Sequence, residues 1–187
     1  MDELALVASV FSPLFAGLIF HGFCIKFGWL RAFAGPIDRG IAIRGRRLFG
    51  ANKTFRGVLA VALGASAGYC LQGAFPALQP PAFRALPTLG LAFLGFALGV
   101  AAMLSELPNS FLKRQLDIAP GAPGGGAAAV FFYLFDQVDL LLGAWLVAWC
   151  WVPPTLSRVL WSVLFVVVVH QLISMLGALL GMRATSR

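Results

Sequence analysis

Long apolar segments dominate this chain and restrict what it can fold into. A helix that crosses a bilayer needs about 20 mostly apolar residues, and its backbone polar groups must be hydrogen-bonded within the protein. Five segments approach that length, and they cover residues 4–25, 58–75, 87–107, 138–152 and 156–182. Only 11% of the residues are charged, against about 25% in an average soluble domain. We therefore expect an all-α integral membrane protein of about five transmembrane helices, folded as a single domain over residues 1–187.

The cations are concentrated between the first two apolar segments. Eight of the fourteen Lys and Arg residues lie there, namely Lys26, Arg31, Arg39, Arg44, Arg46, Arg47, Lys53 and Arg56. Loops rich in Lys and Arg stay on the cytoplasmic side of a membrane. An outside N-terminus and a cytoplasmic C-terminus place twelve cations inside and leave only Arg84 and Arg158 outside. We expect this orientation, in the inner membrane if the cell is bacterial.

The same basic loop indicates the kind of partner. A net charge of +7 would suit nucleic acid in a soluble protein. Beside a membrane, anionic lipid or a nucleotide is the better match, and we expect no nucleic-acid partner. Guanidinium and ammonium groups bind phosphate oxygens well. A simpler alternative is that Arg44, Arg46 and Arg47 only set the topology or touch lipid headgroups.

A second cytoplasmic loop is expected over residues 108–135, and it ends at a pair of acids. Asp136 and Asp139 are three residues apart, so they share one face of a helix. Unpaired acids at a membrane edge are costly and call for a cation. Mg²⁺ prefers such oxygen ligands and completes its shell with water and phosphate. The alternatives are a salt bridge to the first loop or a helix cap by Asp136.

Several separated motifs in both loops resemble those of the CDP-archaeol synthase family. In chain order they are Pro36-Ile37-Asp38, Arg46-Arg47-Leu48-Phe49-Gly50, Asn52-Lys53-Thr54-Phe55-Arg56-Gly57, Ser110-Phe111-Leu112-Lys113-Arg114, Pro120-Gly121 and Asp136-Gln137-Val138-Asp139. That family is similar in turn to the bacterial phosphatidate cytidylyltransferases. The resemblance implies a membrane enzyme that uses CTP and Mg²⁺ to convert a lipid phosphate into a CDP-lipid, with release of pyrophosphate.

The resemblance also implies roles for individual residues. The metal would be held by Asp136 and Asp139. The CTP triphosphate would be bound by the segment that contains Asn52, Lys53, Thr54 and Arg56. A catalytic group in the second loop would face the lipid phosphate, and it comprises Ser110, Lys113 and Arg114.

One departure concerns the acid before that group. Where the archaeal pattern has Gly-Asp, this chain has Ser105-Glu106. Glu106 keeps a carboxylate, so we predict that it is a third metal ligand; the competing interpretation is a salt bridge to a first-loop arginine. The change leaves the identity of the lipid open, and an inactive family member is one alternative to the enzyme.

A small transporter or scaffold is the other alternative, but transporters place polar groups near mid-membrane, and here they gather at the cytoplasmic rim. His21 and His170 lie in apolar segments, with no carboxylate or second His one turn away. We expect both histidines to pack rather than to bind metal.

Overall fold

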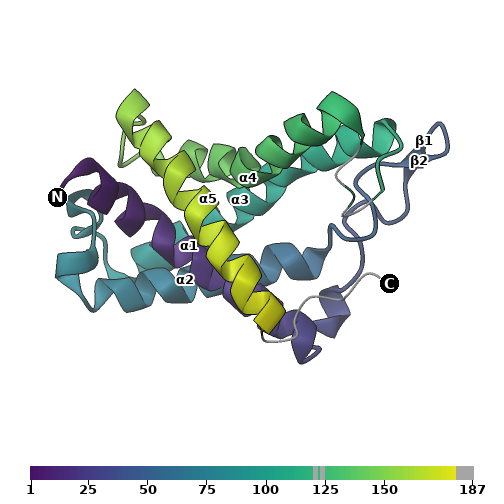
Figure 1. Cartoon of the computed structure of the whole chain (residues 1–187). Helices are drawn as coiled ribbons and strands as arrows, with labels where there is room; N and C mark the ends of the chain where they lie inside the picture. Colours follow the sequence, from purple (N-terminus) through teal and green to yellow (C-terminus); the bar gives the residue numbers. More distant parts are fainter. Residues whose placement is uncertain (120–121, 123–124, 180–187) are drawn as a thin grey trace.

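Five α-helices form one bundle in the computed structural model, which describes residues 1–119, 122 and 125–179 (Figure 1). The helices are α1 (Glu3–Lys26), α2 (Phe55–Gly73), α3 (Thr88–Gln115), α4 (Gly126–Ala148) and α5 (Leu156–Leu179). A short hairpin of β1 (Ala42–Ile43) and β2 (Arg46–Arg47) lies in the basic loop. Single 3₁₀ turns are η1 (Arg31–Phe33), η2 (Pro76–Leu78) and η3 (Pro81–Phe83). The first residue and the last described turn of α5 lie toward opposite ends of the bundle.

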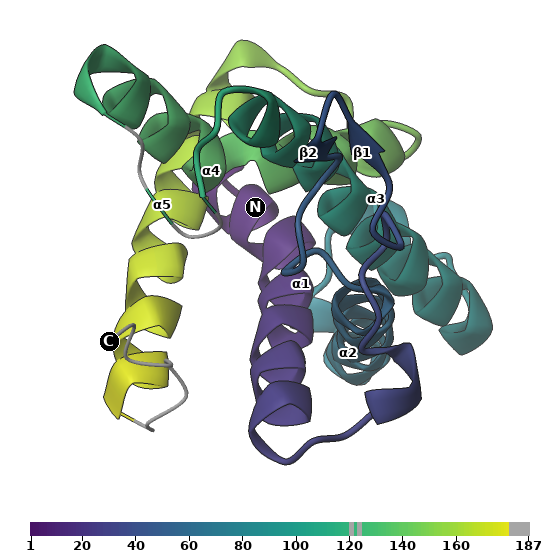
Figure 2. The same ribbon diagram turned by 90° about the vertical axis from the view of Figure 1, so that its right-hand side faces the viewer.

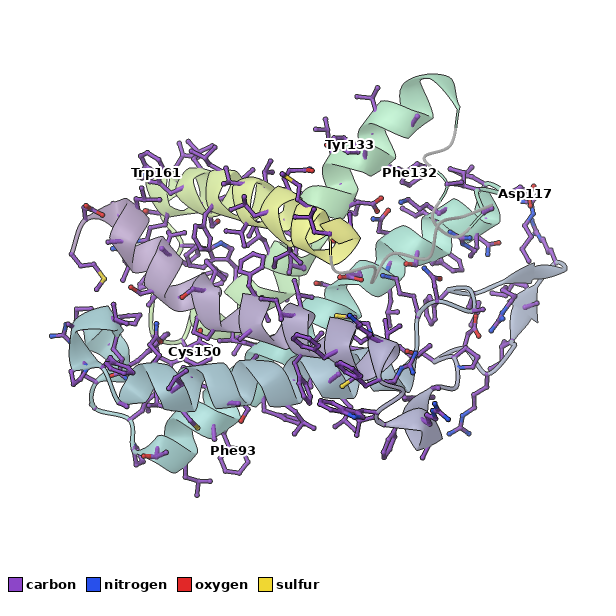
Figure 3. The ribbon with its side chains drawn as sticks, turned by 60° about the horizontal axis from the view of Figure 1, so that its bottom comes forward. Phe93, Asp117, Phe132, Tyr133, Cys150 and Trp161 are labelled. Atoms are coloured by element: carbon purple, nitrogen blue, oxygen red, sulfur yellow. The ribbon has the colours of Figure 1, made fainter. Side chains whose placement is uncertain are left out.

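The outer surface of the bundle is apolar. Among the described residues, four helical stretches are long and apolar enough to cross a membrane: Glu3–Lys26, Thr88–Gln115, Ala129–Ala148 and Leu156–Leu179. Large side chains such as Phe93 and Trp161 point outward (Figure 3), an arrangement that lipid favours and water does not. The expectation of an all-α integral membrane protein is confirmed. The predicted span 58–75 is helical as α2, although it is not among these four stretches.

Glycines let the helices approach closely. A Cβ atom on Gly64 of α2 would lie 2.7 Å from the Cα of Gly17 in α1, and one on Gly99 of α3 would lie 2.6 Å from the Cα of Ala62 in α2. A Cβ on Gly143 of α4 would lie 2.0 Å from the carbonyl oxygen of Ala101 in α3. Small residues are the usual means of close helix packing in lipid. The contact at Gly143 holds α3 close to α4, near the ends of the two helices that carry their polar residues.

The prediction of a loop over residues 108–135 is wrong. Helix α3 continues through Pro108 to Gln115, and α4 begins at Gly126, so the predicted fourth span, 138–152, starts too late. Proline inside a helix removes a hydrogen bond and usually ends the helix, which is why the prediction stopped there. The helix tolerates Pro108 because side chains beyond it bond to α4, and because Lys113 and Arg114 in its last turn complement the helix dipole.

Some predicted features lie outside the described residues. These are the Pro120-Gly121 motif, the end of the predicted fifth span, and the tail cations Arg183 and Arg187.

The basic loop is folded around one buried acid. Asp38 accepts hydrogen bonds from the side chain of Arg47 and from the backbone N–H groups of Gly40, Phe49 and Gly50, at 3.0, 3.2 and 3.0 Å for the three backbone donors. Burial alone would raise the pKa of Asp38, but these donors hold the pKa well below its ordinary value. Asp38 therefore remains ionised and organises the loop.

The loop is bonded to itself and to the ends of α2 and α3. The backbone N–H of Ile37 donates to the carbonyl oxygen of Lys53 at 2.8 Å, and Thr54 caps α2 by accepting from the N–H of Gly57 at 3.1 Å. The hairpin lies beside the end of α3 (Figure 2), and Arg46 donates to the carbonyl oxygen of Gln115 and to Asp117. These contacts place Asn52 and Lys53 beside the end of α3.

Candidate functional site

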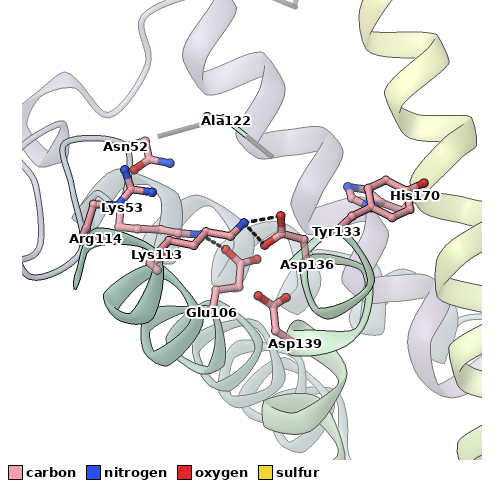
Figure 4. Close-up of a pocket in the computed structure, with 11 residues that line it drawn as sticks. Asn52, Lys53, Glu106, Lys113, Arg114, Ala122, Tyr133, Asp136, Asp139 and His170 are labelled. Carbon is pink, nitrogen blue, oxygen red and sulfur yellow. Dashed lines mark hydrogen bonds and ion pairs between the residues drawn. The ribbon is translucent and has the colours of Figure 1, made fainter. Parts of the chain in front are cut away.

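A pocket of about 400 Å³ lies where the basic loop meets α3, α4 and α5 (Figure 4). It brings together eight of the ten predicted site residues: Asn52, Lys53, Glu106, Ser110, Lys113, Arg114, Asp136 and Asp139. Thr54 and Arg56 do not line it. Thr54 serves as the helix cap, and Arg56 lies in the first turn of α2.

Helix α3 presents a polar face to this pocket. Glu106, Asn109 and Lys113 lie three and four residues apart, which places them on one side of a helix. The loop prediction could not provide this register, because residues in an irregular loop have no fixed spacing in space. The continuation of α3 beyond Pro108 therefore creates the first half of the site.

The second half of the site is the acidic pair on α4. The Nζ of Lys113 donates to both carboxylate oxygens of Asp136, at 2.6 and 2.5 Å. Asn109 Nδ2 donates to Asp136 Oδ1 at 2.6 Å and to Asp139 Oδ2 at 2.8 Å. Asp139 is almost fully buried, whereas Asp136 lies at the pocket mouth with 44% of its side chain exposed. The pair thus extends from the opening into the protein.

Glu106 forms an ion pair with Lys53, a cation of the first loop. One of the two interpretations of Glu106 was a salt bridge to this loop. The partner is a lysine rather than the expected arginine. Both side chains are about four-fifths buried, and the Glu106 carboxylate faces those of Asp136 and Asp139 (Figure 4). The ion pair does not exclude the metal-ligand role, because lysine and a metal ion can neutralise the same acid in different states.

Arg114 offers donors for an anion. Its Nε and Nη1 atoms are buried and have no hydrogen-bond partner among the described residues. A buried donor without a partner costs free energy. Since Arg114 lines the pocket, a phosphate group there would satisfy these donors.

The donor chemistry fits Mg²⁺. Across the residues that the structure describes, no three His, Cys, Asp or Glu side chains are arranged closely enough to hold a metal ion as they stand. Mg²⁺ needs only one or two protein carboxylates, because water and substrate phosphate supply its other ligands. Asp136 and Asp139 provide these carboxylates, and the buried Oδ1 of Asn109 has no partner among the described residues.

The acidic pair also borders a smaller cavity of about 70 Å³. Its apolar wall comes from α1, α4 and α5 and comprises Phe15, Leu18, Leu140 and Val166. The cavity shares Glu106, Asp136, Asp139 and His170 with the larger pocket. The carboxylates therefore lie between a polar opening and apolar helix surfaces.

Sequence reasoning missed three residues of the site. Asn109 contacts both acids, and Tyr133 and His170 line the pocket from α4 and α5. Gln171 Nε2 donates to the Tyr133 hydroxyl at 3.4 Å. Helical spacing from Lys113 would have indicated Asn109 if α3 had been extended. His170 was expected only to pack. No local signal indicates its place in the pocket, because it comes from the last helix.

Comparisons with known proteins agree on one family. The family model described as CarS-like, CDP-archaeol synthase, matches residues 15–186. The CDP-archaeol synthase of Halobacterium salinarum is 38% identical over 112 residues, which cover 58% of this chain and 56% of that protein. The enzyme of the same name from Pyrococcus furiosus is 35% identical over 140 residues, 74% of this chain and 72% of that protein. The match thus spans only about half of the Halobacterium relative.

A solved structure has the same fold. It is described as an intramembrane enzyme for archaeal membrane lipid biosynthesis, and it superposes with a TM-score of 0.65 at 24% sequence identity. The alignment covers 90% of this chain and 92% of that one. The fold is therefore shared over nearly the whole length of both proteins.

Proposed function

Because the chain belongs to the CDP-archaeol synthase family, we propose that it transfers the cytidylyl group of CTP to a membrane lipid phosphate. The products are a CDP-lipid and pyrophosphate. The observation that carries this proposal is the pocket itself, where the paired acids of α4 face cations from the basic loop and from α3. Such a mixture of charges suits a metal-assisted reaction between two phosphates.

The reaction sets a clear demand on the site. An oxygen of the lipid phosphate attacks the α-phosphorus of CTP, the bond from that phosphorus to the β-phosphate oxygen breaks, and pyrophosphate leaves. The nucleophile is already an anion and needs no general base. The barrier is mainly the repulsion between two anions, so catalysis depends on position and charge neutralisation.

The cations are divided between the two substrates in this proposal. Lys53, next to Asn52 at the loop side of the pocket, binds the triphosphate, and Arg56 and Thr54 support that segment at the start of α2. Lys113 and Arg114 bind the lipid phosphate, with the Ser110 hydroxyl beside them. The unpartnered Nε and Nη1 atoms of Arg114 favour this assignment.

We assign Asp136 and Asp139 to hold Mg²⁺, with Glu106 as a third acid. The ion would supply charge neutralisation for the triphosphate and for the departing pyrophosphate. Lys113 and Lys53 neutralise Asp136 and Glu106 in the structure. When substrates bind, each lysine exchanges its carboxylate for a phosphate oxygen.

The pocket is proposed to open toward the cytoplasm, where CTP is found. This orientation places the N-terminus outside and the C-terminus inside; if the cell is bacterial, the membrane is the inner membrane. The basic loop supports this orientation. It lines the pocket, and a loop rich in Lys and Arg should remain on the cytoplasmic side.

The direct test is transfer of label from CTP to lipid. Purified protein would be incubated with α-labelled CTP and a panel of lipid phosphates, including ether-linked isoprenoid lipids and phosphatidic acid, with and without Mg²⁺. We expect labelled CDP-lipid from at least one acceptor, and only with the metal. Absence of transfer to every acceptor by folded protein would favour the inactive or scaffolding alternatives.

A further inference from the structure

Asn109 makes the contact that joins the two acids. Its side chain is buried, with only 2% of the residue exposed. The two hydrogens of its Nδ2 go to different carboxylates, one to Asp136 Oδ1 and one to Asp139 Oδ2. Lys113, by comparison, donates to Asp136.

This bridge restricts the orientation of both carboxylates. Asp139 also accepts from the backbone N–H of Leu140 through Oδ1 at 2.8 Å, so both of its oxygens are held. Asp136 is held at Oδ1 by the amide, while Lys113 bonds to both of its oxygens. If Lys113 leaves for a phosphate, Asn109 remains as the fixed contact from α3.

An amide suits this position better than a cation. Asn109 donates two hydrogen bonds without adding positive charge, so it does not compete electrostatically with a metal ion at the same acids. The reverse orientation of the amide would direct its oxygen at two carboxylate oxygens, which repel it. Only one orientation is therefore compatible with the pair, and it leaves Oδ1 buried without a partner in the described structure.

We propose that Asn109 is a positioning residue, which sets the spacing and orientation of Asp136 and Asp139 for a divalent cation. This inference rests on the proposed metal role of the two acids. Residues that orient metal ligands typically affect metal affinity by about 10- to 100-fold. Replacement of Asn109 by leucine, which has the same branched shape but no hydrogen-bond donor, should weaken Mg²⁺ binding by that order.

The chain offers a matched control in Gln72. This second buried amide also donates twice through Nε2, to the carbonyl oxygens of Ser9 and Leu78 at 2.8 and 3.1 Å, and its Oε1 likewise has no partner in the described part of the chain. It lies outside the pocket. The Gln72→Leu variant should lose stability in the same way but keep its Mg²⁺ affinity.

The experiment measures Mg²⁺ binding without turnover. Full-length protein in detergent would be titrated with Mg²⁺ alone, in the absence of CTP, and its thermal stability recorded; Mn²⁺ binding followed by electron paramagnetic resonance provides a second readout. We expect Asn109→Leu to need at least about 10-fold more Mg²⁺ for half of the effect. Asn109→Ser, which keeps one donor, should fall between Asn109→Leu and the wild type.

The outcomes separate this inference from the proposed function. Unchanged Mg²⁺ affinity in Asn109→Leu would overturn the role of Asn109 alone. If Asn109→Leu does not fold, the Asn109→Ser titration decides by the same criterion. A wild-type protein that binds neither Mg²⁺ nor Mn²⁺, with or without CTP, would overturn both the metal assignment and this inference. Equal loss of affinity in Gln72→Leu would also overturn it, because the effect would then come from general destabilisation.

Discussion

Lys113 on α3 donates hydrogen bonds to both carboxylate oxygens of Asp136 on α4, at 2.6 and 2.5 Å. The ammonium group thus neutralises the carboxylate that we propose as a metal ligand. Lys113 also lies over the ring of Phe132, 5.4 Å from its centre, which gives the cation a second favourable contact. In the proposed reaction Lys113 first neutralises Asp136 and afterwards binds the lipid phosphate.

Asp136→Asn and Asp139→Asn should each lower CTP turnover by roughly 100-fold or more, because each removes a proposed metal ligand. The measurement is initial rate against Mg²⁺ concentration, with membrane insertion checked by recovery of each variant in the washed membrane fraction. Asp117→Asn is the matched control, since Asp117 is paired with Arg46 outside the pocket. Near-normal turnover of both site variants at low Mg²⁺ would refute the metal assignment.

Lys53→Ala should raise the KM for CTP by about 10-fold or more, because a direct charged contact to phosphate is lost. Arg31→Ala removes a cation from the same loop but at η1, away from the pocket, and should leave KM almost unchanged. Equal effects of the two substitutions, after correction for expression, would mean that the loop acts only as a general positive patch.

Glu106→Gln should increase the Mg²⁺ concentration needed for activity, because it removes the third acid. Glu106→Asp keeps a carboxylate and should retain part of the activity. Glu106→Gln also breaks the ion pair with Lys53, so thermal stability has to be recorded beside the Mg²⁺ titration. Lower stability with an unchanged Mg²⁺ requirement would show that Glu106 is a partner of Lys53 and no metal ligand.

Acid should loosen the basic loop through Asp38. Because its pKa is lowered in the folded protein, the carboxylate contributes its full stabilisation above the ordinary value of 3.8 and loses it as the pH falls toward the lower folded value. Limited proteolysis of the loop should become faster as the pH falls below about 4. Asp38→Asn should be cleaved faster at neutral pH and show less change with pH, and an identical pH response in both proteins would contradict this role.

Gly143→Ala should push α3 and α4 apart, because its Cβ would meet the Ala101 carbonyl at 2.0 Å. We expect lower thermal stability and lower turnover, since the contact aligns the two halves of the site. Gly177→Ala in α5 is the control, because a Cβ there has no atom within 4 Å and alanine favours a helix. Similar melting temperatures for the two variants would count against close packing at Gly143.

The apolar segments predicted α1 and α2 to within three residues at each end, but the apolar run 127–135 was placed in a loop although it begins α4. The prediction also failed at Pro108, where a local rule about proline was outweighed by bonds from Asn109 and Lys113 to α4. Those bonds join residues more than twenty positions apart, and no local pattern reports them. The motifs indicated most of the pocket residues, because the family resemblance assigned these residues to one reaction.

The pairing of those residues was harder to predict than their presence. Sequence spacing allowed Glu106 to bind a metal or an arginine, and the structure pairs it with Lys53. That choice depends on how the loop is tied down between Asp38 and α2. The wall formed by Tyr133 and His170 likewise depends on the packing of α4 against α5.

The length of α4 has a consequence for where the two substrates meet. A candidate membrane span covers Ala129–Ala148 of α4, and Asp136 and Asp139 lie within it, about two and three turns from its first residue. The acids thus belong to the apolar part of the helix and not to a polar loop. In the proposed reaction the lipid would therefore stay in the bilayer, and the water-soluble nucleotide would have to reach it there. The hydrocarbon chains would then remain outside the polar pocket, so their length or linkage could vary without any change to the groups proposed to bind phosphate.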